Sequence, residues 1–286
     1  MKNTFPPWVW VLLLLAASAF VAVAAGGDVI NDLALPADYG LATSPASYDL
    51  AGLTWGDTRQ GAASDCWWWA TVASISHQRP DSLARNYAVN LDGTVNVTFF
   101  RNSLPITYQV TSTINPYWGD PNTTLDGANG NGASQIMQKA YAAFRYPVNT
   151  MADLNYGWPN ESISAFGLTA GTLPSTISAF AVAWGQGDVI IVDTGLIVPP
   201  GAVSDHSDSV WSVDAAAGTA VLRSPWGPGY GGYDCYITVD DAWLSAYSVG
   251  SFYGQFGGAA PIPEPATLAV VSTGFLLLLK TRKASL

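Results

Sequence analysis

Residues 64–77, SDCWWWATVASISH, contain neither glycine nor proline, and we expect them to form a helix. Ser64 and Asp65 are residue types that favour the N-cap position, which places Cys66 in the first turn. The chain has 2 cysteines, and the other is Cys235. Cys66 is therefore a buried thiol, one half of a disulfide with Cys235, or a nucleophile.

The remaining pattern places helices first and strands later. Beyond the Cys66 helix, the pattern predicts two strands within 92–118, a helix over 133–144, a third helix within 162–187, a strand over 188–195, two strands joined by a turn near residue 218, and a strand that contains Cys235. This order predicts an α+β fold with a helical lobe that carries Cys66 and a β-rich lobe. We expect the two lobes to span about residues 26–185 and 186–258.

The N-terminal end has the pattern of an export signal. A lysine at position 2 precedes an apolar run from Trp8 to Val23, and small residues follow it. These features predict a secretory signal peptide over residues 1–25, with a cleavage site of the Ala22-Val23-Ala24 type. A transmembrane anchor is the alternative, although the run is short for one.

The C-terminal end, residues 259–286, has a Pro-Glu-Pro at 263–265, an apolar stretch over 266–279 and then a basic cluster. This tail resembles the PEP-CTERM sorting signal of Gram-negative bacteria. The resemblance implies that signal peptidase and an exosortase act during export. It also implies a transient anchor in the inner membrane, through the short apolar segment, before release to the cell surface or the exterior. A plain C-terminal anchor is the alternative.

The composition excludes one class of partner. The net charge is −10, and only 11% of the residues are charged. No basic patch is available to hold a nucleic acid, so we expect none as a partner. The 12 tryptophans keep binding of extracellular polysaccharide by exposed aromatic rings open as a function.

If Cys66 is a nucleophile, it needs a base. A helix N-terminus lowers the pKa of a thiol, and a nearby imidazole lowers it further. His77 lies in the same expected helix, roughly 16 Å along the axis from Cys66. His206, within VSDHSDSVWSV at the start of a later strand, is then the only candidate, since the chain has 2 histidines. A solvated loop histidine is the alternative for His206.

An acyl-transfer site also needs donors for an oxyanion. The backbone N–H of Cys66 at the helix start is one such donor. Gln60, six positions upstream, carries a side-chain amide that is chemically suited to be the second. A glutamine in a polar loop is otherwise simply solvated.

Five segments together resemble the calpain-type cysteine peptidases, which have a papain-like fold. The segments are QGAASDCWWWATVASI, SQIMQKAYAAF, DHSDSVWSV, VLRSPWG and ITVDDAWLSAYSVGSF, in family order across about residues 60–252. The resemblance implies that Cys66 is the nucleophile, His206 the general base and Gln60 the oxyanion donor. It also implies that Trp226 shields the site beside the histidine. Cys235 matches no catalytic position and is expected to be a core thiol.

One position departs from the family pattern. The family has an asparagine before Pro-Trp-Gly that orients the imidazole, and this chain has Ser224 there. A serine hydroxyl is shorter but also accepts a hydrogen bond. Three outcomes follow: Ser224 orients His206 in a working but weaker peptidase, another acceptor such as Asp208 or Asp214 replaces it, or the site is inactive.

Metal ions are not needed for this chemistry, and no metal ligand is assigned. The resemblance implies calcium in acidic loops, but we find no segment here that matches those loops. The paired oxygen donors are Asp205 with Asp208 and Asp240 with Asp241. The cysteines and histidines lack the short spacings of a zinc site.

Two main functions are thus expected. The first is an exported cysteine endopeptidase that hydrolyses protein or peptide substrates. The alternative is a weak or inactive protein of the same fold that serves as an extracellular matrix or binding module.

Overall fold

The structure is a computed structural model that describes residues 44–45, 58, 60, 64–114, 133–145, 154–227 and 233–256. It has an α+β architecture with antiparallel sheets, as the order of elements predicted. The expected signal peptide and sorting signal lie outside the described residues. Within the described part, no helix is both long and apolar enough to cross a membrane.

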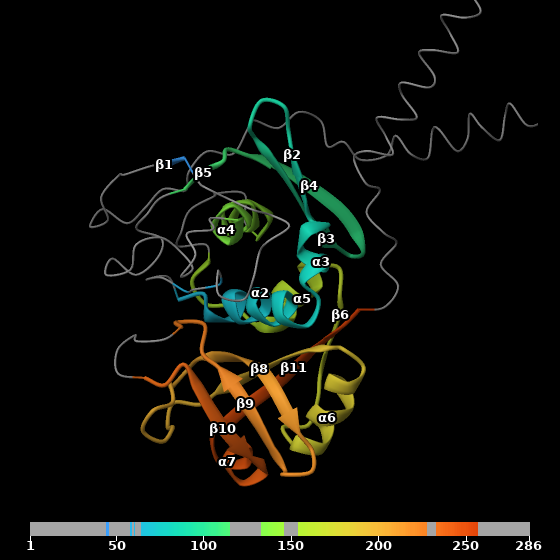
Figure 1. The fold of residues 1–286 in the computed structure, drawn as a ribbon. Helices are drawn as coiled ribbons and strands as arrows, with labels where there is room; N and C mark the ends of the chain where they lie inside the picture. The colour runs from blue at the N-terminus through green and yellow to red at the C-terminus, as the bar shows by residue number, and fades with distance from the viewer. Residues whose placement is uncertain are drawn as a thin grey trace, which may run out of the picture.

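The first part of the chain packs helices around a small antiparallel sheet (Figure 1). Its helices are α2 (Cys66–Gln78), α3 (Pro80–Ala84), α4 (Ala133–Arg145) and α5 (Pro159–Ala165). Its sheet has the order β2-β3-β4, with bounds Tyr87–Val89, Val95–Arg101 and Leu104–Val110. The short strands β1 (Ser44–Pro45) and β5 (Thr113–Ile114) pair with each other.

The second part is a six-stranded antiparallel sheet with the order β10-β9-β8-β7-β11-β6. Its strands are β6 (Thr169–Thr172), β7 (Val189–Thr194), β8 (Ser207–Asp214), β9 (Thr219–Arg223), β10 (Tyr236–Asp240) and β11 (Ser248–Gln255). Two helices accompany it, α6 (Ile177–Gly185) and α7 (Asp241–Tyr247).

The predicted helices over 64–77 and 133–144 are confirmed, and so are the strands on both sides of residue 218. The third helix expected within 162–187 is present as α6, and that region also holds most of α5 and the unpredicted strand β6. β6 pairs with β11, so the chain joins the large sheet well before residue 186, where we expected the lobes to divide. Cys235 lies immediately before β10, not inside it.

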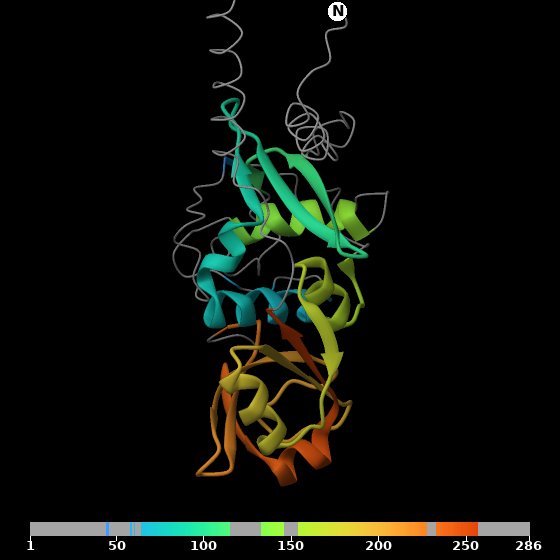
Figure 2. The same ribbon diagram turned by 90° about the vertical axis from the view of Figure 1, so that its right-hand side faces the viewer.

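The centre of the large sheet is covered on both faces, which explains the apolar run of β7. Val189 and Ile191 belong to a core that includes α2, whereas Ile190 and Val192 belong to a core that includes α6. Successive side chains of a strand point to opposite faces, so β7 and β8 lie between the two helices. Figure 2 shows α2 between the large sheet and the small sheet of the first part.

α2 is buried along most of its length. Three consecutive tryptophans, Trp67, Trp68 and Trp69, are at most 1% exposed. The Trp68 ring stacks on Tyr141 of α4 with centroids 4.2 Å apart, and on Phe166 at 5.2 Å. Because α2 is enclosed on all sides, its first residue is held in a fixed position between the two parts of the fold.

Candidate active site

Cys66 is the first residue of α2, as the sequence predicted, and its side chain is partly exposed. The helix begins with hydrogen bonds from the backbone N–H groups of Trp68 and Trp69 to the carbonyl of Asp65. Ser64, two residues before Cys66, is also anchored, since its backbone N–H donates to the Asn155 side chain at 2.9 Å. The thiol therefore lies at a helix N-terminus whose backbone is fixed on both sides.

Asp65 occupies the N-cap position, but its side chain does not cap the helix. The carboxylate is fully buried and accepts a hydrogen bond of 2.5 Å from the Gln138 side chain of α4. Burial raises the pKa of Asp65 to about 7. The residue thus joins α2 to α4, which is a structural role that its N-cap propensity did not predict.

His206 lies at the end of the loop between β7 and β8, next to the first residue of β8, and it is 5% exposed. Its backbone is held by Thr194, which exchanges hydrogen bonds with the N–H and carbonyl of His206. The Trp226 ring lies 4.8 Å from the imidazole, centroid to centroid. The ring thus lies beside the histidine, where the resemblance placed it, and its shielding role stays a prediction.

Ser224, directly after β9, contacts the imidazole. Its Oγ lies 3.3 Å from Nε2 of His206 and also accepts the Trp226 backbone N–H at 3.3 Å. A hydroxyl oxygen accepts two hydrogen bonds, so a protonated Nε2 fits beside the Trp226 donor. That tautomer leaves Nδ1 of His206 as the basic nitrogen.

The other proposed acceptors do not take this place. Asp214 lies at the far end of β8, where its carboxylate accepts the N–H groups of Ala216 and Ala217 in the turn. Asp208 is buried in β8, and the nearby charges that act on it are those of Asp193 and Arg223. Of Ser224, Asp208 and Asp214, Ser224 is the one whose side chain contacts the imidazole.

Gln60 is brought to the same region by the backbone. Its N–H donates to the carbonyl of Pro225 at 2.9 Å, and its side chain is 3% exposed. Two residues earlier, the carbonyl of Thr58 accepts a hydrogen bond of 2.9 Å from the buried Arg223 side chain. These two hydrogen bonds hold Thr58 and Gln60 against the end of β9, beside Ser224.

The Cys66 thiol contacts the large sheet at Ser207, the neighbour of His206. Hydrogen bonding from the backbone and the side chain of Ser207 acts to lower the pKa of the thiol. Burial raises the pKa of Cys66 to about 12, with smaller contributions from the negative charges of Asp65 and Asp193. Burial also lowers the pKa of His206 to about 3. In this arrangement the pair is a neutral thiol and a neutral imidazole at pH 7.

Two buried carboxylates lie near the site, and one of them, Asp193, was missed at the sequence level. Asp193 ends the apolar run of β7, and its Oδ1 accepts the Ser207 hydroxyl at 2.6 Å. Burial raises the pKa of Asp193 to about 6 and that of Asp208 to about 7. The only signal was an aspartate at the end of a strand with no polar alternation, and such a residue is usually solvated.

His77 is engaged elsewhere. Its Nε2 lies 2.9 Å from the carbonyl of Trp211, and the two rings stack at 3.5 Å.

The two cysteines are separate thiols in the structure, so the disulfide alternative is contradicted. Cys235 is 8% exposed, which agrees with a core thiol.

In the part of the chain that the structure describes, no three His, Cys, Asp or Glu residues come together to hold a metal. Two of the paired aspartates that we considered for calcium have local roles. Asp240 caps α7 through the Trp243 N–H, and Asp241 accepts the Ile177 N–H. Asp205 lies in the loop before His206 and has a φ of 51°.

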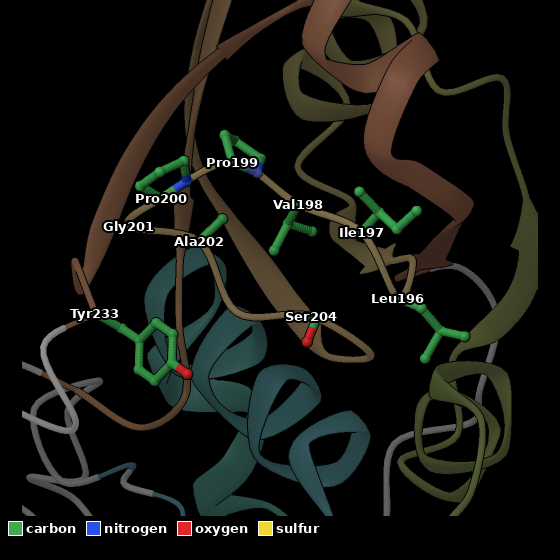
Figure 3. A pocket seen from close by; sticks show the side chains of 9 residues that line it. All are labelled: Leu196, Ile197, Val198, Pro199, Pro200, Gly201, Ala202, Ser204 and Tyr233. Atoms are coloured by element: carbon green, nitrogen blue, oxygen red, sulfur yellow. The ribbon is translucent and has the colours of Figure 1, made fainter.

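A shallow hollow of about 460 Å³ lies beside this loop (Figure 3). It is formed by the bend from Leu196 to Ala202, with Ser204 and Tyr233 at its edge. Leu196 and Ile197 are 80% and 81% exposed. Neither Cys66 nor His206 lines it, so it is a surface feature next to the candidate site and not the site itself.

Comparisons with known proteins add no family assignment: no family model matches the chain, and no curated protein matches it.

Proposed function

We propose that the protein is a cysteine endopeptidase with a papain-like fold of the calpain type. The observation that supports this most is the contact between Nε2 of His206 and Oγ of Ser224, at 3.3 Å. Cys66 lies at the start of α2 against Ser207, one residue from that histidine. A nucleophile at a helix N-terminus, a base and an orienting acceptor are the parts that covalent acyl transfer needs.

In the first half of the reaction, the sulfur of Cys66 attacks the peptide carbonyl carbon while its proton passes to Nδ1 of His206. The carbonyl π electrons move to oxygen, and the Cys66 N–H and the Gln60 amide donate to that oxyanion. The C–N bond then breaks, and the leaving amine takes the proton from His206. The product is an acyl thioester on Cys66.

In the second half, His206 accepts a proton from a water that attacks the thioester. The C–S bond breaks, the carboxylic acid leaves, and the proton returns through His206 to the sulfur. Ser224 takes no part in the bond changes of either half. It is a positioning residue that keeps the protonated Nε2 directed away from the thiol.

The neutral resting pair implies a slow enzyme in the unliganded state. The proton must move from a thiol whose pKa is about 12 to an imidazole whose pKa is about 3. Both pKa values are displaced chiefly by burial, so an event that admits polar groups to the cleft brings them closer together. Substrate binding is one such event.

Hydrolysis of casein or of a fluorogenic peptide tests the function. The wild-type chain is compared with Cys66→Ala, and Cys235→Ala serves as the matched control because it removes the other thiol. We expect activity in the wild type and in Cys235→Ala, and none in Cys66→Ala. Equal hydrolysis by the wild type and Cys66→Ala would contradict the proposal.

A second candidate is a binding module on the same fold. The displaced pKa values of Cys66 and His206 favour weak catalysis, and two aromatic side chains near the helix start are exposed, Tyr156 at 77% and Trp158 at 59%. Exposed aromatic rings suit stacking on sugars. The test is polysaccharide binding that survives Cys66→Ala and is lost in Trp158→Ala. Trp67, Trp68 and Trp69 are buried and cannot serve this role.

The proposed location is outside the cytoplasm, after export and removal of both ends. Support comes only from the sequence of residues 1–25 and 259–286. The intact mass of the chain from the native organism tests it. A mass that includes either end would contradict the corresponding cleavage.

A further inference from the structure

The segment 155–158, just before α5, is bonded to the backbone that leads into the Cys66 helix. Ser64 donates its N–H to the Asn155 side chain at 2.9 Å, and its carbonyl accepts the N–H of Tyr156 at 3.0 Å. Both backbone hydrogen-bonding groups of Ser64 are thus engaged by this segment. A displacement of the segment therefore moves the start of α2, where the N–H of Cys66 is a proposed oxyanion donor.

Arg145, the last residue of α4, also contacts this segment. Its Nη2 donates to the carbonyl of Tyr156 at 2.7 Å, and its Nε pairs with the Glu161 carboxylate at 3.1 Å. The other carboxylate oxygen of Glu161 accepts the backbone N–H of Trp158 at 3.3 Å. The arginine side chain is 10% exposed, so these contacts are only weakly screened by solvent. One guanidinium therefore holds the segment both directly and through Glu161.

The same guanidinium packs on the first turn of α2. It lies over the ring of Trp67, the residue after Cys66, at 4.6 Å from the ring centroid. Gly157 lies against both groups: a methyl group there would come within 2.5 Å of Cε2 of Trp67 and 2.9 Å of Nη2 of Arg145. The backbone of the segment approaches this closely because position 157 is a glycine.

Tyr156 has a backbone conformation that depends on its surroundings. Its φ is 57°, in the left-handed region that residues with a Cβ seldom occupy. Such a conformation persists where neighbouring contacts impose it. Here its N–H is bonded to Ser64 and its carbonyl to Arg145, while its side chain is exposed. The backbone contacts, and not burial of the ring, therefore maintain this conformation.

We propose that Arg145 is a positioning residue: it holds the segment 155–158 in its left-handed conformation against Ser64, and so fixes the Cys66 N–H that stabilises the oxyanion. The inference rests on the proposed function, because it assigns a support to the same nucleophile. Arg145 acts through the backbone and takes no part in the bond changes. It lies one position beyond the segment SQIMQKAYAAF, so neither the motifs nor the resemblance pointed to it.

Peptide hydrolysis, with kcat and KM measured separately, tests the proposal. An oxyanion donor acts on the transition state, and a misplacement of about 1 Å in a catalytic group costs about 100-fold in rate. Arg145→Ala leaves the Cys66 N–H in place but loosens its support. We therefore expect kcat to fall by about 10- to 100-fold, and KM to change much less.

Tyr156→Gly separates a positioning role from a purely structural one. Glycine adopts the left-handed region without the cost that other residues meet, so the segment then depends less on Arg145. In the Arg145→Ala background, Tyr156→Gly should raise kcat by about fivefold or more. In the wild-type background it should change kcat little, because the arginine already holds the segment.

Arg101→Ala is the matched control for the loss of an arginine. Arg101 likewise lies over an aromatic ring, that of Phe144, at 4.6 Å, and it donates to the Phe144 carbonyl. These contacts join β3 to α4 and not to the start of α2. Arg101→Ala should lower the thermal stability but leave kcat within about twofold of wild type.

A second variant covers the case in which Arg145→Ala does not fold. Gly157→Ala keeps the arginine but adds a methyl group that meets Trp67 and the guanidinium, so it displaces the segment. It should lower kcat more than KM, as Arg145→Ala does. An unchanged kcat in folded Gly157→Ala would contradict the proposal.

Hydrogen exchange of the backbone over residues 64–69, followed by peptide mass spectrometry, gives a readout that does not need hydrolysis. Exchange there should be faster in Arg145→Ala and unchanged in Arg101→Ala. The proposal is overturned by unchanged exchange or kcat in folded Arg145→Ala, or by an equal loss of kcat with and without Tyr156→Gly. If the exchange pattern holds while the wild type shows no Cys66-dependent hydrolysis, the proposed function fails and the anchoring of the helix start stands.

Discussion

Two kinds of side chain surround Cys66: aromatic and apolar groups on one side, and buried polar groups on the other. On the α2 side, Trp68 lies among aromatic rings, and the enclosing core is almost wholly apolar. On the sheet side, Ser207 lies opposite a buried carboxylate, Asp193, and a second buried carboxylate, Asp208, follows Ser207 on the other face of the same strand. The first side fixes where the sulfur lies, because close-packed rings tolerate little movement. The second side contributes to its protonation state, because the buried charge of Asp193 raises the pKa of the thiol.

This difference indicates that the two functions of a nucleophile site are separable. Substitutions on the aromatic side should change the free energy of unfolding at every pH. Substitutions on the sheet side should change stability and reactivity in a pH-dependent way.

The largest effect is expected on the aromatic side. Trp68→Ala removes a fully buried ring and should lower the free energy of unfolding by about 3–5 kcal/mol, the usual cost of deleting a large core aromatic. Urea unfolding measures it at pH 5 and pH 8, with a similar loss at both. Trp158→Ala, at a 59% exposed position, is the matched control and should cost much less. A loss of unfolding free energy that varied strongly with pH would contradict the difference drawn between the two sides.

The sheet side should show the opposite behaviour in Asp208→Asn. The folded-state pKa of Asp208 is about 7, above its ordinary 3.8. The folded state therefore holds a proton that the unfolded state lacks between these values, and stability from this group falls as pH rises through them. Replacing the carboxylate with an amide should stabilise the fold by about 2–4 kcal/mol at pH 8, and the gain should disappear below pH 4. Thermal unfolding at several pH values measures this gain. Asp81 is exposed, so Asp81→Asn is the control for the change in net charge. A gain that did not depend on pH would contradict the prediction.

A smaller effect is expected at Ser224. A neutral hydrogen bond contributes about 0.5–1.5 kcal/mol, so Ser224→Ala should lower kcat/KM about threefold to tenfold. Ser224→Asn places a longer acceptor at the same position and should restore or raise the activity. Peptide hydrolysis measures both variants, with thermal unfolding to confirm the fold. If Ser224→Ala kept full activity, the 3.3 Å contact with His206 would have no role in turnover.

The local features of the site were predictable from the sequence, and its cross-strand features were not. The helix start at Cys66 follows from a segment without glycine or proline, and His77 was excluded by its distance along that helix. The Asp193–Ser207 pair depends on the register of two strands joined by a long loop, and no local pattern specifies a register. β6 was missed for the same reason, since Thr169–Thr172 has no apolar alternation and is held by pairing with β11.

The most direct test of the central claim is irreversible labelling of the purified chain by a peptidyl cysteine-peptidase inhibitor, compared with His206→Ala. If Cys66 is a nucleophile served by His206, the wild type gains one adduct, on Cys66, and the rate falls by about 100-fold or more in His206→Ala. Equal rates in the two proteins, or an adduct on Cys235, would contradict the account.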